Sequence, residues 1–434
     1  MTFTRKLTGA AMATGLSLFA ALPAWAQEEA PKVDSGDTAW MMTSTVLVLA
    51  MILPGLALFY GGLTRAKNML STMTQIGAVA ALAMLVWVTW GYTMAFGEGG
   101  GAFVGGFGKL FMAGVTADSV SGTLPELVFA SFQMTFAAIT VALVLGGTVE
   151  RMKFAAVMVF ALVWLTLVYF PIAHMVWASG GLFFEMGALD YAGGTVVHIN
   201  AGVSALVAAI MLGKRRGYPS EPMPPHSVTL TFVGTGLLWV GWFGFNAGSA
   251  LAANGGASLA MINTFVATAA AGLAWMITER ALGHKGSALG FCSGIIAGLV
   301  AVTPAAGNVG VFGAVVLGAV ASIICVFAVT KLKPALGYDD SLDAFGIHGV
   351  GGIVGAIGTG ILNAPMFGGP GDGSVTIGAQ TLIQVEAVLT TIVLSTIGTI
   401  IAVSIAKAAT GLRVSTEVEQ EGLDLGEHGE RAYN

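Results

Sequence analysis

Two histidines set in apolar sequence are the residues best placed to carry chemistry. His198 and His348 each lie a few positions inside a long apolar segment. An ionisable side chain in such a segment is costly to bury and usually faces the interior of a helix bundle or a cavity. Histidine also changes its protonation state most readily near neutral pH. One buried histidine often makes only a helix–helix hydrogen bond, but two at matching places predict a shared site, provided that both helix ends are recessed into the bundle.

Aromatic residues gather near the ends of three apolar segments. Each group alone is typical of an interfacial belt or of helix packing. Aromatic faces attract a small cation by about 0.5–2 kcal/mol, and Ser249 adds a hydroxyl acceptor. Together they predict a site for a small cation that also donates hydrogen bonds. The three groups are Phe132-Gln133-Met134-Thr135-Phe136, His174-Met175-Val176-Trp177 and Trp242-Phe243-Gly244-Phe245-Asn246-Ala247-Gly248-Ser249.

A haem-binding redox enzyme is the main alternative for a pair of intramembrane histidines, because such pairs can serve as axial haem ligands. The sequence offers no third ligand beside them, no C-x-x-C-H motif and no acidic cluster near either one. Cys292 and Cys325 lie in apolar stretches and are predicted to be buried bystanders. We therefore predict no metal and no cofactor. Asp190, four residues before Gly194, is predicted to cap or brace the start of the next helix.

The composition indicates which elements must position these residues. Hydrophobic residues make up 56% of the chain and charged residues only 9%, whereas soluble domains carry roughly 45–50% and about 25%. Apolar runs near the ~20 residues that cross a bilayer predict an all-α polytopic membrane protein in contact with lipid. No basic stripe with interleaved aromatics suggests nucleic acid as a partner. Eleven transmembrane helices are predicted, at 40–61, 73–96, 127–148, 154–177, 194–213, 228–246, 258–278, 287–303, 309–330, 342–362 and 379–406.

The two ends of the chain and the loop charges predict its orientation. Arg5 and Lys6, an apolar run and the site Ala24-Trp25-Ala26 indicate a cleaved signal peptide over residues 1–26, with a first transmembrane helix as the alternative. Most Lys and Arg residues fall in loops on one side of the predicted helices and in the C-terminal tail. The positive-inside rule therefore predicts an outer N-terminus and a cytoplasmic C-terminus.

The domain organisation follows from these spans. We predict a transmembrane domain over 27–406 and a cytoplasmic C-terminal tail over 407–434, with a glycine-rich outer lid over 97–126. The first ten helices suit an inverted 5+5 repeat, with the eleventh as a terminal helix outside it. The acidic, polar tail is predicted to be solvated, and a docking segment with a regulatory role is the alternative.

Long strings of the sequence resemble the Amt/Mep/Rh ammonium transporter family, specifically its bacterial Amt branch. The resemblance covers essentially the whole chain after the signal peptide, including the tail GLRVSTEVEQEGLDLGEHGERAY at 411–433. The other strings are FYGGLTRAKN at 59–68, FQMTFAAIT at 132–140, PIAHMVWASGG at 171–181, GALDYAGGTVVHINAG at 187–202, GWFGFNAGSA at 241–250, CSGIIAGLVAVTPA at 292–305 and FGIHGVGGIVGA at 345–356.

The resemblance implies roles for the matching positions. Trp177, Phe136 and Ser249 would form an outer ammonium recruitment site. Phe136 and Phe245 would stack below it as a gate, and Asp190 would match a structurally important acidic residue of the family. The pore would be lined or supported by His198, His348, Trp242 and Thr303.

The resemblance also implies a biological setting. It implies a multi-pass protein of the bacterial inner membrane, a transporter rather than an enzyme, that serves nitrogen assimilation. Family members are homotrimers with one pore per subunit, and PII-type signal proteins contact their tails. The expected partners are thus ammonium or ammonia, lipid, two further copies of the chain and a PII-type protein.

Elementary electrostatics favours a specific route through such a pore. A bare cation is expensive to place in an apolar conduit, so the conduit favours a neutral species. Ammonium can lose a proton and potassium cannot. The sequence therefore predicts that ammonium is recruited, deprotonated and passed as ammonia, and it leaves open whether the proton follows. An ammonium sensor and a channel for a neutral solute such as carbon dioxide or urea are the remaining alternatives.

Overall fold

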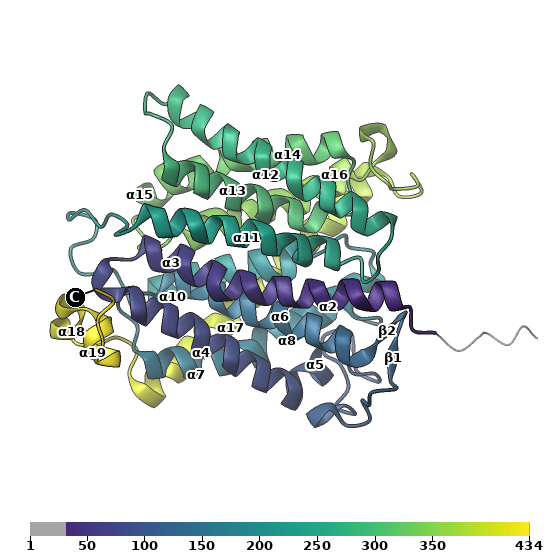
Figure 1. The fold of residues 1–434 in the computed structure, drawn as a ribbon, viewed down its shortest axis with the longest axis horizontal. Helices are drawn as coiled ribbons and strands as arrows, with labels where there is room; N and C mark the ends of the chain where they lie inside the picture. Colours follow the sequence, from purple (N-terminus) through teal and green to yellow (C-terminus); the bar gives the residue numbers. More distant parts are fainter. Residues whose placement is uncertain (1–31, 434) are drawn as a thin grey trace, which may run out of the picture.

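The computed structural model describes residues 32–433, so the predicted signal peptide lies outside the described residues. Within this range the chain forms eleven long apolar helices that run side by side, as Figure 1 shows. The prediction of an all-α protein with eleven spans is confirmed. The spans are Ser35–Leu63, Ala66–Phe96, Glu126–Gly147, Phe154–Glu185, Gly194–Leu212, Val228–Gly248, Gly255–Ala281, Ala288–Ala305, Val311–Leu336, Phe345–Leu362 and Ile377–Thr410.

Several spans change helix type along their length. The first span comprises α2 (Ser35–Ala50), η1 (Met51–Leu56) and α3 (Ala57–Leu63), and the second comprises η2 (Ala66–Asn68), α4 (Met69–Val86), η3 (Trp87–Gly91) and α5 (Tyr92–Phe96). The third comprises α6 (Glu126–Val144) and η5 (Leu145–Gly147). The fourth comprises α7 (Phe154–Trp164), η6 (Leu165–Tyr169), α8 (Phe170–Trp177) and α9 (Leu182–Glu185). The sixth to ninth comprise α11 (Val228–Gly248); α12 (Gly255–Ala281); α13 (Ala288–Val302) and η8 (Thr303–Ala305); and α14 (Val311–Phe327), η9 (Ala328–Leu332) and α15 (Lys333–Leu336). The eleventh is α17 (Ile377–Thr410).

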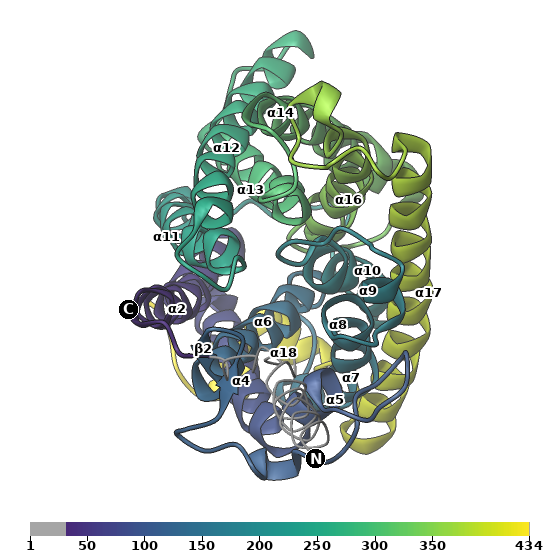
Figure 2. The same cartoon turned by 90° about the vertical axis from the view of Figure 1, so that its right-hand side faces the viewer.

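Small residues let the helices approach closely. A Cβ atom added to Gly318 on α14 would lie 2.2 Å from the carbonyl oxygen of Ala267 on α12, so only glycine fits at this contact. In a bilayer, where lipid supplies no hydrophobic drive between helices, such packing holds a bundle together. α11 lies against α2 and α3, and the long α17 runs along the side formed by α7, α10 and α16, as Figure 2 shows.

The two histidine-bearing spans are built alike. The fifth opens with the π-helical η7 (Gly194–Ile199) and continues as α10 (Asn200–Leu212). The tenth opens with the π-helical η10 (Phe345–Gly349) and continues as α16 (Val350–Leu362), and α10 and α16 are both 13 residues long. η7 packs against α16 and η10 against α10, so the two spans meet at their first turns. This matched construction is what an inverted repeat predicts.

The segments outside the spans differ in part from expectation. The long loop, residues 97–125, is irregular as predicted but includes η4 (Leu110–Met112) and a ribbon of β1 (Val120–Ser121) and β2 (Leu124–Pro125), paired antiparallel. A further short helix, η11 (Pro365–Phe367), precedes α17. α17 continues to Thr410, so the tail begins at 411 rather than 407.

The prediction of a solvated tail is wrong. Its helices α18 (Thr416–Glu421) and α19 (Leu423–His428) fold back onto the bundle, and Leu423 and Asp424 are buried. Asp424 accepts hydrogen bonds from the first amides of α4, where a carboxylate complements the helix dipole. The tail packs on its own bundle instead, and the alternative of a docking segment with a regulatory role stays a prediction. We call the end of the bundle that carries the tail the tail end.

Candidate functional site

A narrow apolar cavity lies in the middle of the bundle, where the fifth and tenth spans cross. Its volume is about 10 Å³, close to the least that holds one water-sized molecule. Apart from two histidines, every lining residue is apolar, so the cavity would solvate a cation poorly. The lining residues are Met51, Leu56, Phe59, Ile139, Leu143, His198, Leu238, Trp242, Phe245, Ile296 and His348.

His198 and His348, which the sequence analysis predicted to share a site, lie side by side in this cavity. Their Nδ1 atoms lie 3.3 Å apart, and the ring centroids lie 5.3 Å apart with an angle of 24° between the ring planes. Both side chains are buried, at 1% and 4% exposed. The two spans approach closely beside the histidines, because a Cβ atom on Gly202 would lie 2.2 Å from the amide nitrogen of Gly349.

The hydroxyl of Thr303 decides which nitrogen of each histidine carries the proton. Thr303 Oγ1 donates to the carbonyl oxygen of Leu299 at 2.8 Å and accepts from Trp242 Nε1 at 2.9 Å. Its proton is therefore used, and His198 Nε2, 3.3 Å away, must be the donor to it. His198 Nδ1 is then an acceptor, so His348 Nδ1 donates to it. The pair thus has one shared proton between the rings and one lone pair, on His348 Nε2, left over.

The aromatic residues predicted to form a gate are stacked above the histidines. The rings of Phe136 and Phe245 lie 4.2 Å apart at 21° and close the path. The Phe245 ring lies 6.1 Å from that of His198. Trp177 lies edge-on to Phe136 at 5.6 Å and is part-exposed. The structure therefore brings Trp177, Phe136 and Phe245 together on the side of the histidines away from the tail end.

Ser249 lies one helical turn beyond Phe245 on the same helix. Its Oγ donates to the carbonyl oxygen of Phe245 at 2.8 Å and is part-exposed. Since this bond uses the hydroxyl proton, the oxygen lone pairs remain to accept from a donor above the gate. An aromatic edge and face beside a free acceptor suit a cation that carries N–H bonds.

Asp190 caps the start of the fifth span, as its position predicts. Its carboxylate accepts hydrogen bonds from the amides of Gly193, Gly194, Thr195 and Val196 and from the Thr195 hydroxyl. Its carbonyl oxygen also accepts from the Trp177 indole at 2.9 Å. With its oxygens filled by the protein, this carboxylate fixes the segment that carries His198 and the indole above the gate.

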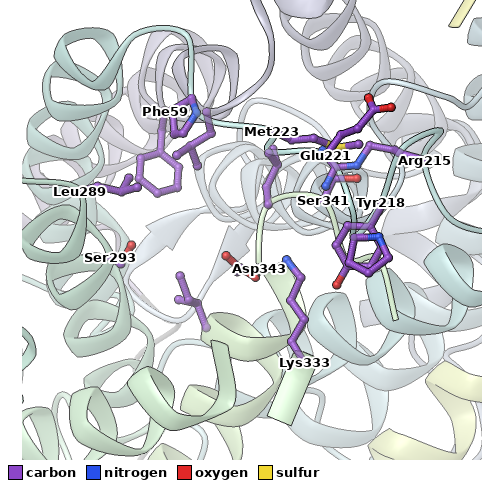
Figure 3. Close-up of a pocket in the computed structure, with 15 residues that line it drawn as sticks. Phe59, Arg215, Tyr218, Glu221, Met223, Leu289, Ser293, Lys333, Ser341 and Asp343 are labelled. Atoms are coloured by element: carbon purple, nitrogen blue, oxygen red, sulfur yellow. Dashed lines mark hydrogen bonds and ion pairs between the residues drawn. The ribbon is translucent and has the colours of Figure 1, made fainter. Parts of the chain in front are cut away.

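A wider pocket of about 300 Å³ opens at the tail end (Figure 3). Phe59 lines both this pocket and the central cavity. Ile347, next to His348 in the sequence, also lines the pocket at the tail end. Lys333 and Asp343 form an ion pair of 2.6 Å at its wall. The stacked rings, the central cavity and this pocket therefore follow one another through the bundle.

A buried charge cluster beside the pocket was missed by sequence reasoning, which counted its basic residues only as loop charges. Arg215 pairs with Asp339 at 2.8 Å and with Glu150 at 3.0 Å, and Arg65 also pairs with Glu150 at 2.8 Å. Burial alone would raise the pKa of Glu150, but Arg215 and Arg65 hold it below its usual range. Burial lowers the pKa of the neighbouring Arg151 to about 10.

No local sequence pattern predicts this charge cluster, because its members come from loops far apart in the sequence. One clue was available in the adjacent Glu150 and Arg151 at the end of an apolar span, since a carboxylate there needs a partner. The described residues, 32–433, contain no group of three or more His, Cys, Asp or Glu side chains that could hold a metal ion. Both cysteines are free and buried within this range.

Comparison with known proteins decides the family. The model of the Ammonium Transporter Family matches residues 39–433. The chain belongs to this family. It is 48% identical over 420 residues to the ammonium transporter of Aquifex aeolicus, and the alignment covers 96% of this chain and 97% of the relative. It is 44% identical over 434 residues to that of Mycobacterium tuberculosis, with 92% and 91% covered.

Solved structures of the ammonium transporter family share the fold. The crystal structure of Saccharomyces cerevisiae Mep2 superposes with a TM-score of 0.81 at 38% identity, covering 89% of each chain. A structure described as a sensor Amt protein superposes with a TM-score of 0.84 at 28% identity, covering 91% of this chain and 98% of the other. The resemblance noted in the sequence is confirmed, and a transport function rather than catalysis fits these ammonium transporter relatives.

Proposed function

We propose that this member of the ammonium transporter family moves ammonium nitrogen across a membrane by stripping one proton from it. The supporting observation is the path itself: a closed aromatic gate, two hydrogen-bonded histidines in a cavity of about 10 Å³, and an open pocket beyond them. Trp177, Phe136 and Ser249 recruit ammonium above the gate. Ammonium then gives one proton to water at this part-exposed site, Phe136 and Phe245 part, and neutral ammonia passes the histidines.

The chemistry of the path favours deprotonation over passage of the cation. Moving a charge into low-dielectric surroundings without a partner costs several kcal/mol or more. The cavity has no carboxylate, so no opposite charge there offsets this cost for ammonium. Ammonia is neutral, and His348 Nε2 offers it a lone pair as an acceptor. His198 and His348 line the path, with Trp242 and Thr303 holding His198 in one tautomer.

The remaining features of the proposal concern setting and partners. We place the N-terminus outside and the C-terminus in the cytoplasm of a bacterial inner membrane, because basic loop residues and the tail share one end of the bundle. A cleaved signal peptide over 1–26, homotrimeric assembly and a PII-type partner at the tail end belong to the same proposal, as does a role in nitrogen assimilation. Cross-linking of membranes followed by mass measurement tests the trimer.

The direct test is current and pH change in proteoliposomes after an ammonium jump. We expect ammonium-specific signals in the wild type and their loss or marked change in Ser249→Leu and in the double variant His198→Ala/His348→Ala. His284→Ala is the matched control, since His284 is exposed in the loop between α12 and α13, and it should behave as wild type. Unchanged rate and ion selectivity in the double variant would contradict the proposal.

A sensor of ammonium is the second candidate, favoured by the structural likeness to a sensor Amt protein. Electrogenic transport would show as current, and conduction of ammonia alone as a pH change without current. A protein that binds ammonium, measured by calorimetry, yet gives neither signal would support the sensor. Equal flux of urea or carbon dioxide would instead support a neutral-solute channel.

A further inference from the structure

His174 is a buried titratable residue outside the path, on the helix that carries Trp177. It is 3% exposed. Its Nδ1 lies 2.8 Å from the carbonyl oxygen of Ala95, at the end of the second span. Its Nε2 lies 2.8 Å from the carbonyl oxygen of Gly101, in the long loop. One ring thus bridges two points on the segment 95–101.

Both partners of the ring are acceptors, and this bears on how many protons the ring carries. A neutral imidazole carries a proton on one nitrogen and a lone pair on the other. A carbonyl oxygen has no proton to give, so in a neutral ring one lone pair would face another at hydrogen-bond distance. Only the doubly protonated ring donates to both oxygens, and hydrogen bonds from a charged donor are the stronger kind.

The surroundings hold this charge with dipoles rather than with an opposite charge. No carboxylate among residues 32–433 forms an ion pair with His174. Lys109 of the long loop is paired with Glu126, and Glu185 accepts from the Gly180 amide. The elements packed against α8 carry four titratable groups: Tyr92 on α5, Tyr169 on η6, Glu185 on α9 and His198 on η7. The loops beside α8 add Glu98, Lys109 and Asp190.

The clamped segment closes around the end of α8. The amide of Leu182, which follows α8, donates to the carbonyl oxygen of Ala102 at 2.9 Å. The long loop is therefore bonded to His174 before the end of α8 and to Leu182 after it. Trp177 is three residues beyond His174 and reaches Phe136 and the Asp190 carbonyl from this end. Loosening of the segment would therefore free the end of the helix that holds the indole.

We propose that His174 is an imidazolium while the long loop is docked, and that it is a positioning residue for Trp177 through this clamp. The link to ammonium recruitment rests on the proposed function, whereas the clamp does not. Loss of one ring proton would remove one of the two bonds. The segment then loosens, and the site above the gate becomes less ordered.

Hydrogen exchange of the purified full chain tests the clamp. The amides of Gly97, Gly105 and Gly106 donate to the carbonyl oxygens of Thr93, Met94 and Gly97, in or next to this segment, and report its docking. Between about pH 5 and pH 9, with intrinsic exchange corrected, we expect protection in the wild type to fall about tenfold, the typical effect of a charged hydrogen bond on an equilibrium. His174→Lys keeps the charge and should stay protected throughout. His174→Gln mimics the neutral ring and should be poorly protected at every pH, and the exposed His284→Gln should match the wild type.

Uptake in proteoliposomes tests the positioning role. The half-saturating ammonium concentration should rise with pH in the wild type, stay constant in His174→Lys and be raised at all pH values in His174→Gln. Wild-type protection that is independent of pH, or a Gln variant as protected as the wild type at acidic pH, would overturn the clamp. Protection that behaves as expected with the same half-saturation in every variant would overturn the positioning role. Failure of the proposed function appears elsewhere, as normal flux in His198→Ala/His348→Ala.

Discussion

The hydroxyl of Thr303 serves three groups at once, and this single side chain fixes the order of protons in the cavity. It donates to Leu299 and accepts from Trp242 and His198. Because the Trp242 N–H and the His198 N–H are both buried, neither can turn to water if this acceptor is lost. Thr303 therefore acts on the path by orienting the imidazole, although its own oxygen does not line the cavity.

At this scale we predict that Thr303→Val destabilises the protein by about 1–3 kcal/mol, since an isosteric side chain leaves two buried donors unpaired. Ammonium flux should also fall several-fold, because His198 is no longer held in one tautomer. Thermal unfolding in detergent and flux in proteoliposomes are the measurements. Thr303→Ser keeps the hydroxyl and should retain both properties. Wild-type stability of the Val variant would show that Trp242 and His198 find other partners.

Two carboxylates mark the elements that carry the histidines. Asp190 precedes His198 by eight residues, and Asp340 precedes His348 by the same number. Asp190 caps η7, and Asp340 Oδ2 accepts from the amide of Phe345 at the start of η10, at 2.7 Å. The second carboxylate is less well satisfied, because its Oδ1 is buried without a partner. Burial raises the pKa of Asp340 to about 6.

The element scale gives a pH-dependent prediction for Asp340→Asn. The folded chain holds the Asp340 proton more tightly than an unfolded chain, whose aspartates titrate near 3.9. The stability from that proton is therefore present below about pH 4 and is lost as the pH rises through about 6. Above that pH the wild type bears a buried charge that Asn lacks, so the variant should be more stable by up to about 3 kcal/mol.

Melting temperatures measured at several pH values between about 4 and 8 check this prediction. The difference between the variant and the wild type should vanish toward the acid end. Asp372→Asn is the control, because Asp372 is exposed and its carboxyl is not buried in either state. A variant that is less stable than the wild type at every pH would mean that the charged form is well solvated by its neighbours.

The sequence predicted the elements better than it predicted their contacts. Apolar length alone located all eleven spans, with ends that differ from the structure by up to eight residues, because a bilayer demands long uncharged helices. The meeting of His198 and His348 required a close approach of the two spans, which depends on glycine contacts such as that of Gly202 with Gly349. The spacing of Asp340 to His348 equals that of Asp190 to His198, and this equality could have predicted that Asp340 caps η10.

At the scale of the whole molecule, charged groups tie the tail end together. Glu150, between α6 and α7, binds Arg215 and Arg65 from two other loops. The tail joins this network through Glu419, which binds Arg413 and the amide of Arg216. Local sequence patterns could not predict the pairs of Glu150, since Arg65, Glu150 and Arg215 come from different loops and only folding brings them together. The network fixes the loops around the pocket at the tail end.

We predict that Glu150→Gln destabilises the whole bundle by about 3–5 kcal/mol, because it leaves Arg215 and Arg65 without their shared partner in a buried place. The loss should be nearly independent of salt, since buried pairs are weakly screened. Thermal unfolding at low and high ionic strength is the measurement. Glu417→Gln, on the exposed side of α18, should have little effect. A strong salt dependence of the Glu150 effect would indicate that water reaches the cluster.

The stacked rings of Phe136 and Phe245 also affect whether protons can leak across the membrane. A continuous file of water through a membrane protein relays protons and drains the gradient that powers the cell. Here the rings lie 4.2 Å apart above a cavity of about 10 Å³, so no such file is continuous at rest. At rest the protein therefore offers protons no continuous water path across a membrane, however abundant the protein becomes.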